Sequence, residues 1–198
     1  MFSLNKILVA SSNTGKVKEF EQILGLAGLD VISQASLQVP SAPEPYGTFV
    51  ENALSKARNA GKYTDFPVIS DDSGICVKNL DGRPGVRSAR YAHSKASDEE
   101  NNSFLLEKMS GESDREAYFY CVIVILAKPT DPAPLIAFGK WSGEILKAPR
   151  GKGGFGYDSI FFDPKLGKSA AELSSSEKNT VSHRGCAMKN LLKLINSE

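Results

Sequence analysis

The segment Val68–Gly74, with the sequence VISDDSG, constrains this chain most, because two β-branched residues lead directly into two adjacent carboxylates. The apolar pair at its start predicts a short buried strand that ends where Asp71 and Asp72 begin. Serine and glycine then favour a turn, and residues 75–77 are typical of a returning strand. In an α/β sheet, ligands bind beyond the carboxyl ends of the strands, so this pair of acids is expected at a functional site.

The two neighbouring carboxylates also carry a physical requirement of their own. Two negative charges side by side repel each other, and a divalent cation or a raised pKa relieves the repulsion most simply. A plain polar turn is the alternative interpretation, because Asp, Ser and Gly are all turn formers. Taken alone, the segment favours the turn, and the motifs elsewhere in the chain shift the balance towards a metal or catalytic site.

Length and composition exclude several classes of protein. The chain has 198 residues, which predicts a single domain over residues 1–198, divided into two lobes. Its 24 basic residues nearly cancel its 23 acidic ones, so the bulk charge gives no sign of a nucleic-acid-binding or membrane-surface protein. The apolar run at residues 7–10 is too short for a signal peptide or a spanning helix. Three widely spaced cysteines (Cys76, Cys121 and Cys186) fit reduced thiols in the cytoplasm.

The N-terminal segment predicts a phosphate site. Residues 6–10 are typical of a strand, residues 11–16 (SSNTGK) of a polar turn, and the apolar spacing over residues 17–25 of a helix. This arrangement places backbone N–H groups and Lys16 at a helix N-terminus, where phosphate binds favourably. The turn is not a Walker A loop, because it lacks the first glycine and the hydroxyl residue after the lysine. Helix capping is an additional role for Asn13 and Thr14. The residues expected to contact phosphate are Ser11, Ser12, Asn13, Thr14, Gly15 and Lys16.

A second helix is predicted from about Thr48, where apolar residues recur at helical spacing. Glu51 falls outside the apolar stripe, and Thr48-x-x-Glu51 matches a capping box, so a structural N-terminal acid is one interpretation. The other interpretation is that Glu51 is a third carboxylate, which completes a metal site with Asp71 and Asp72.

The middle of the chain predicts the remainder of an α/β sheet. A loop with three arginines at residues 81–91 favours an anion or a partner surface, and a solvated basic loop is the simpler alternative. The apolar, β-branched run at residues 117–127 predicts a central strand, with a neighbouring hairpin strand at residues 134–146. The other predicted elements are a strand at residues 29–33, an irregular loop at residues 40–45 and a helix at residues 98–109.

The segment Arg150–Asp158 concentrates glycine and aromatic residues. Its four glycines allow close approach of the backbone, and Phe155 and Tyr157 offer flat faces on which a nucleobase can stack. A hairpin turn with glycine bulges and packed aromatic rings is the alternative. The segment is therefore a candidate base-binding loop.

The C-terminal helix repeats the cationic pattern of the first helix. Residues 174–179 lead into a helix from about Thr180. His183 and Arg184 lie near its start, where a cation opposes the helix macrodipole unless an anion lies nearby. Because Lys16 does the same near the other end of the chain, an anionic ligand explains both better than chance.

Taken in order, these motifs resemble those of the inosine/xanthosine triphosphate pyrophosphatase family, the house-cleaning hydrolases of deaminated purine nucleotides. The resemblance covers nearly the whole chain, and so many motifs in this order make it specific. The motifs are residues 11–16 (SSNTGK), 48–53 (TFVENA), 70–74 (SDDSG), 84–85 (PG), 88–91 (SARY), 155–158 (FGYD) and 182–185 (SHRG).

The resemblance implies an α/β fold, with an elongated mixed β-sheet flanked by helices in two lobes and a central nucleotide cleft. It also implies a homodimer that hydrolyses ITP, dITP and XTP to the monophosphate and pyrophosphate with Mg²⁺. By the resemblance, Glu51 and Asp72 would bind the metal and Asp72 would also be the proton acceptor. Asp71 is a further predicted ligand because of its place in the acidic pair. The implied substrate contacts, beside the phosphate turn, are Ser73, Phe155, Gly156, Tyr157, Asp158, Lys178, His183 and Arg184.

Physical chemistry supports these roles independently. A triphosphate carries about four negative charges, so cations must neutralise it while carboxylates hold a metal. The attacking water needs a base or a metal, and the acidic pair can supply either. A purine with an oxo group at C6 needs hydrogen-bond donors, which Lys178, His183 or Arg184 can provide, whereas the amino group of adenine would face them as another donor. Arg184 is predicted to select the base, because its guanidinium is always charged.

Two other functions share some of these features. A nucleotide-binding regulatory protein would have the same loops and cations, yet it has little use for three converging carboxylates. A metal-dependent phosphatase of small phosphate esters would have the acids, yet it has no need of Phe155 and Tyr157. Product analysis with several nucleotides separates all three functions.

Overall fold

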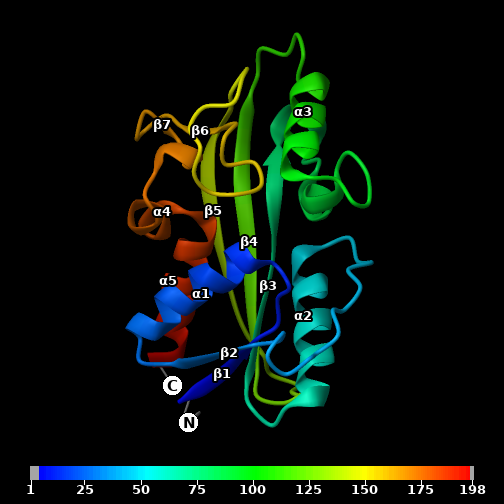
Figure 1. Ribbon diagram of the computed structural model, residues 1–198, viewed down its shortest axis with the longest axis vertical. Coiled ribbons are helices and arrows are strands. Elements are labelled where there is room, and N and C mark those ends of the chain that lie inside the picture. The colour runs from blue at the N-terminus through cyan, green and yellow to red at the C-terminus, as the bar shows by residue number, and fades with distance from the viewer. Residues whose placement is uncertain (1–4, 197–198) are drawn as a thin grey trace. The chain divides into compact units, whose positions relative to one another are not determined.

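The computed structural model describes residues 5–196 and contains a seven-stranded mixed sheet with helices (Figure 1), which confirms the predicted α/β class. The strands lie in the order β2-β1-β3-β4-β5-β6-β7, so the sheet is open, with β2 and β7 at its ends. Strand β1 is parallel to both of its neighbours, whereas β6 is antiparallel to β5 and β7. The strands are β1 (Lys6–Val9), β2 (Asp30–Ser33), β3 (Val68–Val77), β4 (Glu116–Leu126), β5 (Leu135–Ile145), β6 (Phe161–Asp163) and β7 (Lys168–Ser169).

Five α-helices are present in the part of the chain that the structure describes, together with short 3₁₀ turns. None of the helices within residues 5–196 is long and apolar enough to cross a membrane. The helices are α1 (Thr14–Leu26), α2 (Phe49–Ala60), α3 (Asp98–Lys108), α4 (Ser175–Val181) and α5 (His183–Asn196).

The chain divides into two compact units. The first unit contains residues up to Asp72, Cys121–Gly139 and the residues from Arg184 onwards. Its helices α1 and α5 lie together on one face of the strands and α2 lies on the other (Figure 1). The apolar core between the strands and α1 and α5 includes Ile69, Phe20 and Met188, all fully buried.

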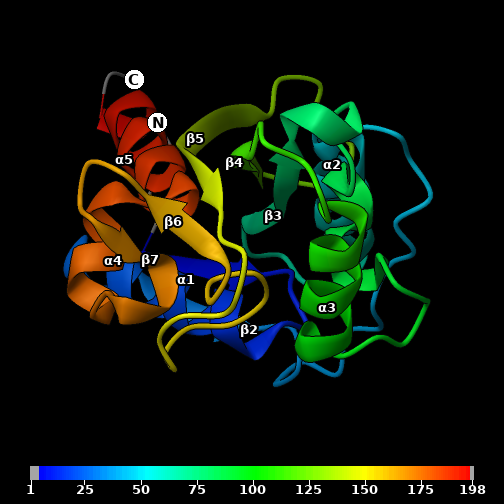
Figure 2. The same ribbon diagram turned by 90° about the horizontal axis from the view of Figure 1, so that it is seen from above.

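The second unit contains Ser73–Tyr120 and Lys140–His183. Helix α3 lies on one face of its strands, and α4 lies on the other, beside β6 and β7 (Figure 2). An aromatic core fills this unit, in which the ring of Phe119 packs against those of Trp141 and Phe161 at centroid separations of 6.3 and 4.7 Å.

Strand β3 differs from the sequence-based prediction, because it does not turn at the acidic pair. It runs without a break from Val68 to Val77 and is almost wholly buried. Gly74 lies inside the strand, where a side chain would collide with the carbonyl of Gly85 and the hydroxyl of Ser88. The glycine is therefore needed for close packing rather than for a turn.

Two helix boundaries also differ from the prediction. Helix α1 begins at Thr14, three residues early, because Asn13 is its N-cap and accepts a hydrogen bond from the Lys16 N–H at 3.0 Å. The predicted last helix is in fact two helices. Ser174 and Glu177 form a capping box at the start of α4, and Ser182 has an extended conformation that separates α4 from α5.

Candidate functional site

Asp71 and Asp72 are bound by two different sets of partners. Asp71 accepts hydrogen bonds from the Arg184 guanidinium, at 2.9 and 3.3 Å, and lies 3.1 Å from the Lys16 ammonium. Asp72 accepts from Asn52 Nδ2 at 3.1 Å and from Lys56 Nζ at 3.3 Å. Successive side chains of a strand point to opposite faces, so Asp71 faces α1 and α5, whereas Asp72 faces α2.

The anion near the two helix-start cations is therefore part of the protein. Lys16 lies in the first turn of α1 and Arg184 in the first turn of α5, and both contact the carboxylate of Asp71. Arg184 also forms an ion pair with Glu19 of α1. These carboxylates offset the unfavourable interaction of the cations with the positive ends of the helix macrodipoles. From the sequence, a bound anionic ligand was expected to do so.

Their environments push the pKa values of the two neighbouring acids apart. Burial favours the neutral form of Asp71, but Lys16 and Arg184 outweigh it and hold the pKa of Asp71 well below its usual range. Burial also raises the pKa of Asp72, and Lys56 offsets this only in part. Such a divergence within a pair of carboxylates is typical of groups with separate roles. Asp71 is the permanent anion, and Asp72 is the group suited to accept a proton.

Glu44 and Lys56 belong to the surroundings of Asp72, and neither was predicted from the sequence. The Lys56 ammonium contacts Glu44 Oε1 at 2.5 Å as well as Asp72 Oδ1 at 3.3 Å, so two carboxylates share one cation. One turn earlier on α2, the Asn52 amide bonds both the N–H and the C=O of Tyr46, at 3.1 and 3.3 Å. Together these contacts fasten the loop that carries Glu44 to α2, beside Asp72.

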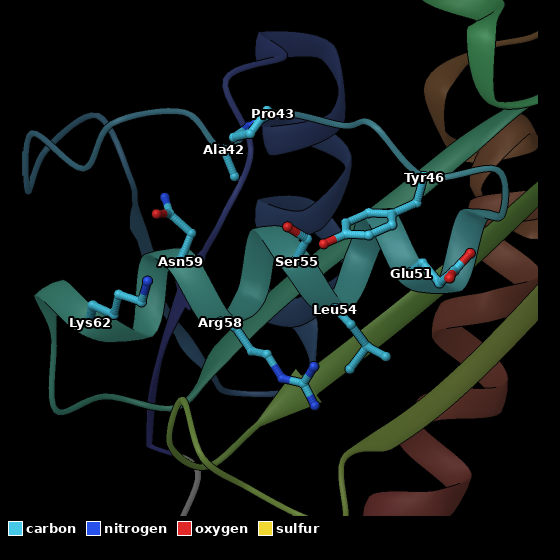
Figure 3. Close-up of a pocket in the computed structure, with 9 residues that line it drawn as sticks. All are labelled: Ala42, Pro43, Tyr46, Glu51, Leu54, Ser55, Arg58, Asn59 and Lys62. Carbon is cyan, nitrogen blue, oxygen red and sulfur yellow. The ribbon is translucent and has the colours of Figure 1, made fainter.

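Glu51 does not join the acidic pair, contrary to the predicted set of three carboxylates. Thr48 is the N-cap of α2, because its hydroxyl oxygen accepts from the Glu51 N–H at 3.4 Å, and the Glu51 carboxylate accepts from the same hydroxyl at 2.5 Å. It lines a cavity of about 390 Å³ on the outer side of α2, with Tyr46 and Arg58 (Figure 3). Within residues 5–196, no group of three or more His, Cys, Asp and Glu side chains is arranged to hold a metal ion. The physical reason is the alternation of β3, which turns Asp71 away from the face that Asp72 shares with α2.

The predicted phosphate turn forms the exposed N-terminus of α1. Ser12, Asn13 and Thr14 are exposed, while Ser11, Gly15 and Lys16 are half-buried. Ser11 Oγ accepts a hydrogen bond from the N–H of Asn13 at 3.3 Å, which stabilises the approach to the helix. The remaining N–H groups of the first turn lie at the positive end of a 13-residue helix, which suits an anion. Ser73 follows Asp72 in β3 and is half-buried.

In the second unit, the glycine-rich loop is built around the buried carboxylate of Asp158. Asp158 Oδ2 accepts from the N–H of Phe155 at 2.9 Å and from the Lys178 ammonium at 2.5 Å. The same ammonium lies 4.5 Å from the centroid of the Phe155 ring, which is half-buried. Gly154 has a φ of +77°, and a side chain there would collide with the Asp158 carboxylate. Phe155, Asp158 and Lys178, each a predicted substrate contact, are thus brought together in one cluster.

The side chains of Tyr157 and His183 are both buried in this unit. The Tyr157 ring is buried, and its hydroxyl donates to the carbonyl of Ser88 at 2.7 Å, so it offers no free face for a base. The buried His183 ring stacks on Phe119, at a centroid separation of 4.7 Å and an interplanar angle of 11°. Of the two aromatic rings that the sequence predicts for base stacking, Phe155 is the one that is not buried.

Comparison with known proteins agrees with these features. Residues 7–194 match the Ham1 family. The chain is 54% identical to the dITP/XTP pyrophosphatase of Nitrosomonas europaea over 192 residues, which cover 97% of this chain and 95% of that protein. It is 48% identical to the dITP/XTP pyrophosphatase of Escherichia coli K12 over 194 residues, which cover 97% and 98%. The structure of a HAM1 protein from Coxiella burnetii matches with a TM-score of 0.90 and 44% identity, over 98% of this chain and 99% of that one. The resemblance found in the sequence is confirmed.

Proposed function

The chain belongs to the Ham1 family, and we propose that this enzyme hydrolyses ITP, dITP and XTP to the nucleoside monophosphate and pyrophosphate with Mg²⁺. The observation that carries the proposal is the divergence of Asp71 and Asp72. A buried carboxylate with a raised pKa, Asp72, directly follows one that is locked between the cations of two helix starts. This pairs a proton acceptor with an anchored set of phosphate-binding groups.

The surroundings of Asp72 fit a magnesium ion. Magnesium is held by one or two carboxylates together with substrate phosphates, so a cluster of three protein acids is not needed. Glu44 and Asp72 supply such a pair, since their oxygens already share one cation, the Lys56 ammonium. We assign these two residues as the ligands, in place of the predicted Glu51 and Asp71. When bound, the ion would neutralise phosphate charge and make a water molecule more acidic.

The residues of the chain have separate tasks in the reaction. Asp72 accepts the proton of the water whose oxygen attacks the α-phosphorus, while the bond to the bridging oxygen breaks and pyrophosphate leaves. The N–H groups at the start of α1 and the Lys16 ammonium bind phosphate oxygens and neutralise their charge. Lys56 stabilises the ionised form of Asp72 until the proton arrives.

Recognition of the base is assigned to Phe155 and Lys178. Phe155 provides a face for stacking, which accepts any purine. The Lys178 ammonium lies over that ring and is a donor without any acceptor capacity, so it favours an oxo group over the amino group of adenine. Arg184, the selector predicted from the sequence, is instead held by Asp71 and Glu19. We therefore transfer the selecting role from Arg184 to Lys178.

We further propose that the enzyme is a homodimer and works in the cytoplasm. The dimer rests on the family resemblance alone. The compartment is supported by the cysteines, because Cys76 and Cys121 are buried free thiols and Cys186 is a half-buried one.

The deciding experiment is hydrolysis of ITP, dITP, XTP and ATP with and without Mg²⁺, with the products separated by anion-exchange chromatography. We expect monophosphate and pyrophosphate from the first three nucleotides, little product from ATP, and none without the metal. Diphosphate and orthophosphate as products would refute the pyrophosphatase proposal and favour a phosphatase. Binding without turnover would favour a nucleotide-binding regulatory protein.

A further inference from the structure

Gly156 in the base-binding loop is held on both sides by one helix of the second unit. Its N–H donates to Asp98 Oδ2 at 2.6 Å, and its C=O accepts from Asn102 Nδ2 at 3.1 Å. Asp98 and Asn102 are four residues apart in α3, so both lie on the same face of the helix. The amide of Asn102 is fixed further by a second bond to Ser159 Oγ, at 3.3 Å.

These two bonds determine the direction in which the loop carries Phe155. The N–H of Gly156 belongs to the peptide that links it to Phe155, and its C=O belongs to the next peptide. Gly156 has a φ of +61°, a backbone conformation that residues other than glycine rarely adopt. Bonds on both of its polar groups hold this conformation, while Asp158 holds the N–H of Phe155 itself.

The α3 face also borders an open space beside the aromatic ring. A cavity of about 520 Å³ is lined by Asn102 and Ser103 on α3 and by Phe155 on the loop, among other residues. Asn102 is 8% exposed, so its bonds to Gly156 and Ser159 are partly shielded from water. Bonds protected in this way persist better than exposed ones, because water does not compete for their donors and acceptors.

We propose that Asp98 and Asn102 are positioning residues for the substrate base, which fix the Gly156 conformation and hence the angle of the Phe155 ring. The inference rests on the proposed function, in which Phe155 stacks on the purine. Neither residue belongs to the proposed phosphate-binding or proton-accepting set, and both contact the loop directly, so both would act through the loop. Their loss should weaken binding of the base and leave the phosphate site and the chemical step intact.

The test compares Asn102→Ala with Ser103→Ala, an exposed neighbour on α3 that lines the same cavity. The substrate is ITP, and the base-free probe is inorganic tripolyphosphate as a competitive inhibitor. Asn102→Ala should raise KM for ITP roughly tenfold, the scale of one lost buried hydrogen bond, with kcat and the inhibition constant of tripolyphosphate within about twofold of wild type. Ser103→Ala should change none of the three.

A rescue variant separates positioning from general stability. Asp98→Asn keeps an oxygen that accepts from the Gly156 N–H and should preserve KM, whereas Asp98→Ala should raise it. Equal weakening of ITP and tripolyphosphate in Asn102→Ala would overturn the proposal, because it would mean a general structural role. An unchanged KM for ITP would overturn it as well.

A second measurement works without catalysis. Trypsin should cleave ligand-free Asn102→Ala after the exposed Lys152 several times faster than it cleaves wild type or Ser103→Ala, because the glycine-rich loop is released. Equal cleavage rates would overturn the clamp whatever the activity. A wild-type protein that releases no pyrophosphate from ITP would refute the proposed function, and the proteolysis would still decide on the clamp.

Discussion

The change Asp71→Asn removes one negative charge from the interior of β3 and keeps the size of the side chain. In the wild type that charge lies between the Lys16 ammonium, at 3.1 Å, and the Arg184 guanidinium, at 2.9 Å. The Asp71 side chain has no exposed surface, and those of Lys16 and Arg184 are only 14% and 2% exposed. An amide at this position leaves both cations in the interior without their shared partner.

The size of the effect follows from this geometry. Removing one partner of a buried ion pair costs about 3–5 kcal/mol, because the other charge is left uncompensated. Arg184 keeps its second partner, Glu19, so the lower end applies, about 3 kcal/mol in the free energy of unfolding. For a chain of this length each kcal/mol lowers Tm by about 2–4 °C, so Asp71→Asn should lower Tm by roughly 6–12 °C.

The matched control is the same change at the next residue. In Asp72→Asn, the Lys56 ammonium keeps Glu44 at 2.5 Å, so the cation retains a partner. The free energy of unfolding should therefore change by no more than about 1 kcal/mol. Asp72→Asn lacks the proposed proton acceptor, however, and kcat for ITP should fall at least about a hundredfold. The two variants should therefore differ: Asp71→Asn lowers the free energy of unfolding, whereas Asp72→Asn lowers kcat with little change in stability.

The assay combines three measurements on each variant: Tm without nucleotide, kcat for ITP at saturating Mg²⁺, and the Mg²⁺ concentration that gives half-maximal rate. Asp71→Asn should leave the magnesium requirement unchanged at a temperature where the variant is folded. An unaltered Tm together with a severalfold higher magnesium requirement would refute the reasoning. It would mean that Asp71 is a metal ligand, as the sequence had predicted.

Three further predictions follow from other contacts. Lys16→Ala should lower Tm by several degrees and weaken ITP and tripolyphosphate alike, because the same ammonium compensates a buried carboxylate and belongs to the proposed phosphate-binding set; a stable variant with normal affinity for both would contradict this. Lys178→Met should lower kcat/KM for ITP about tenfold more than for ATP, whereas Arg184→Ala should lower both equally, which steady-state kinetics on the two nucleotides will decide. Burial raises the pKa of Tyr157, so its neutral phenol adds stability below about pH 10 that is lost as the pH rises further. The drop in Tm between about pH 9 and pH 11 should therefore be smaller in Tyr157→Phe than in wild type.

Local periodicity and capping were sufficient to predict most of the elements. The β-branched run at residues 117–127 matches β4, and Thr48, the first residue of the Thr48-x-x-Glu51 pattern, is the N-cap of α2. Such features depend on residues within a few positions of one another, so a single sequence contains the whole signal. The phosphate turn belongs to the same class, because Asn13 caps α1 by a bond to a residue three positions away.

The continuity of β3 through the acidic pair could not be predicted, because it depends on residues that are distant in the sequence. Asp and Gly in succession favour a turn unless distant groups compensate the charges. The group that binds Asp71 most closely, Arg184, lies 113 residues away in the sequence, and nothing near either residue signals the pairing. The packing of Tyr157 is similar, since its hydroxyl donates to the carbonyl of Ser88, 69 residues away.

Glu44 and Lys56 were missed although part of their signal is local. Asn52 and Lys56 are four residues apart in α2, so a helical interpretation already places an amide and a cation on one face. That face looks towards β3, where Asp72 binds both. A polar pair on the sheet-facing side of an amphipathic helix requires a buried partner. The nearest pair of adjacent acids in the sequence contains Asp72, which lies 16 residues after Lys56.

The continuity of β3 gives a physical reason for having two acids in succession. In a turn, adjacent carboxylates would share one environment and titrate as a pair. In a strand they point to opposite faces, so each meets a different set of partners. On one face Lys16 and Arg184 keep Asp71 charged, and on the other burial raises the pKa of Asp72. In the proposed mechanism, two neighbouring residues of one strand thereby provide a fixed anion beside the first turn of α1 and a proton acceptor for the reaction, which a single carboxylate could not supply together.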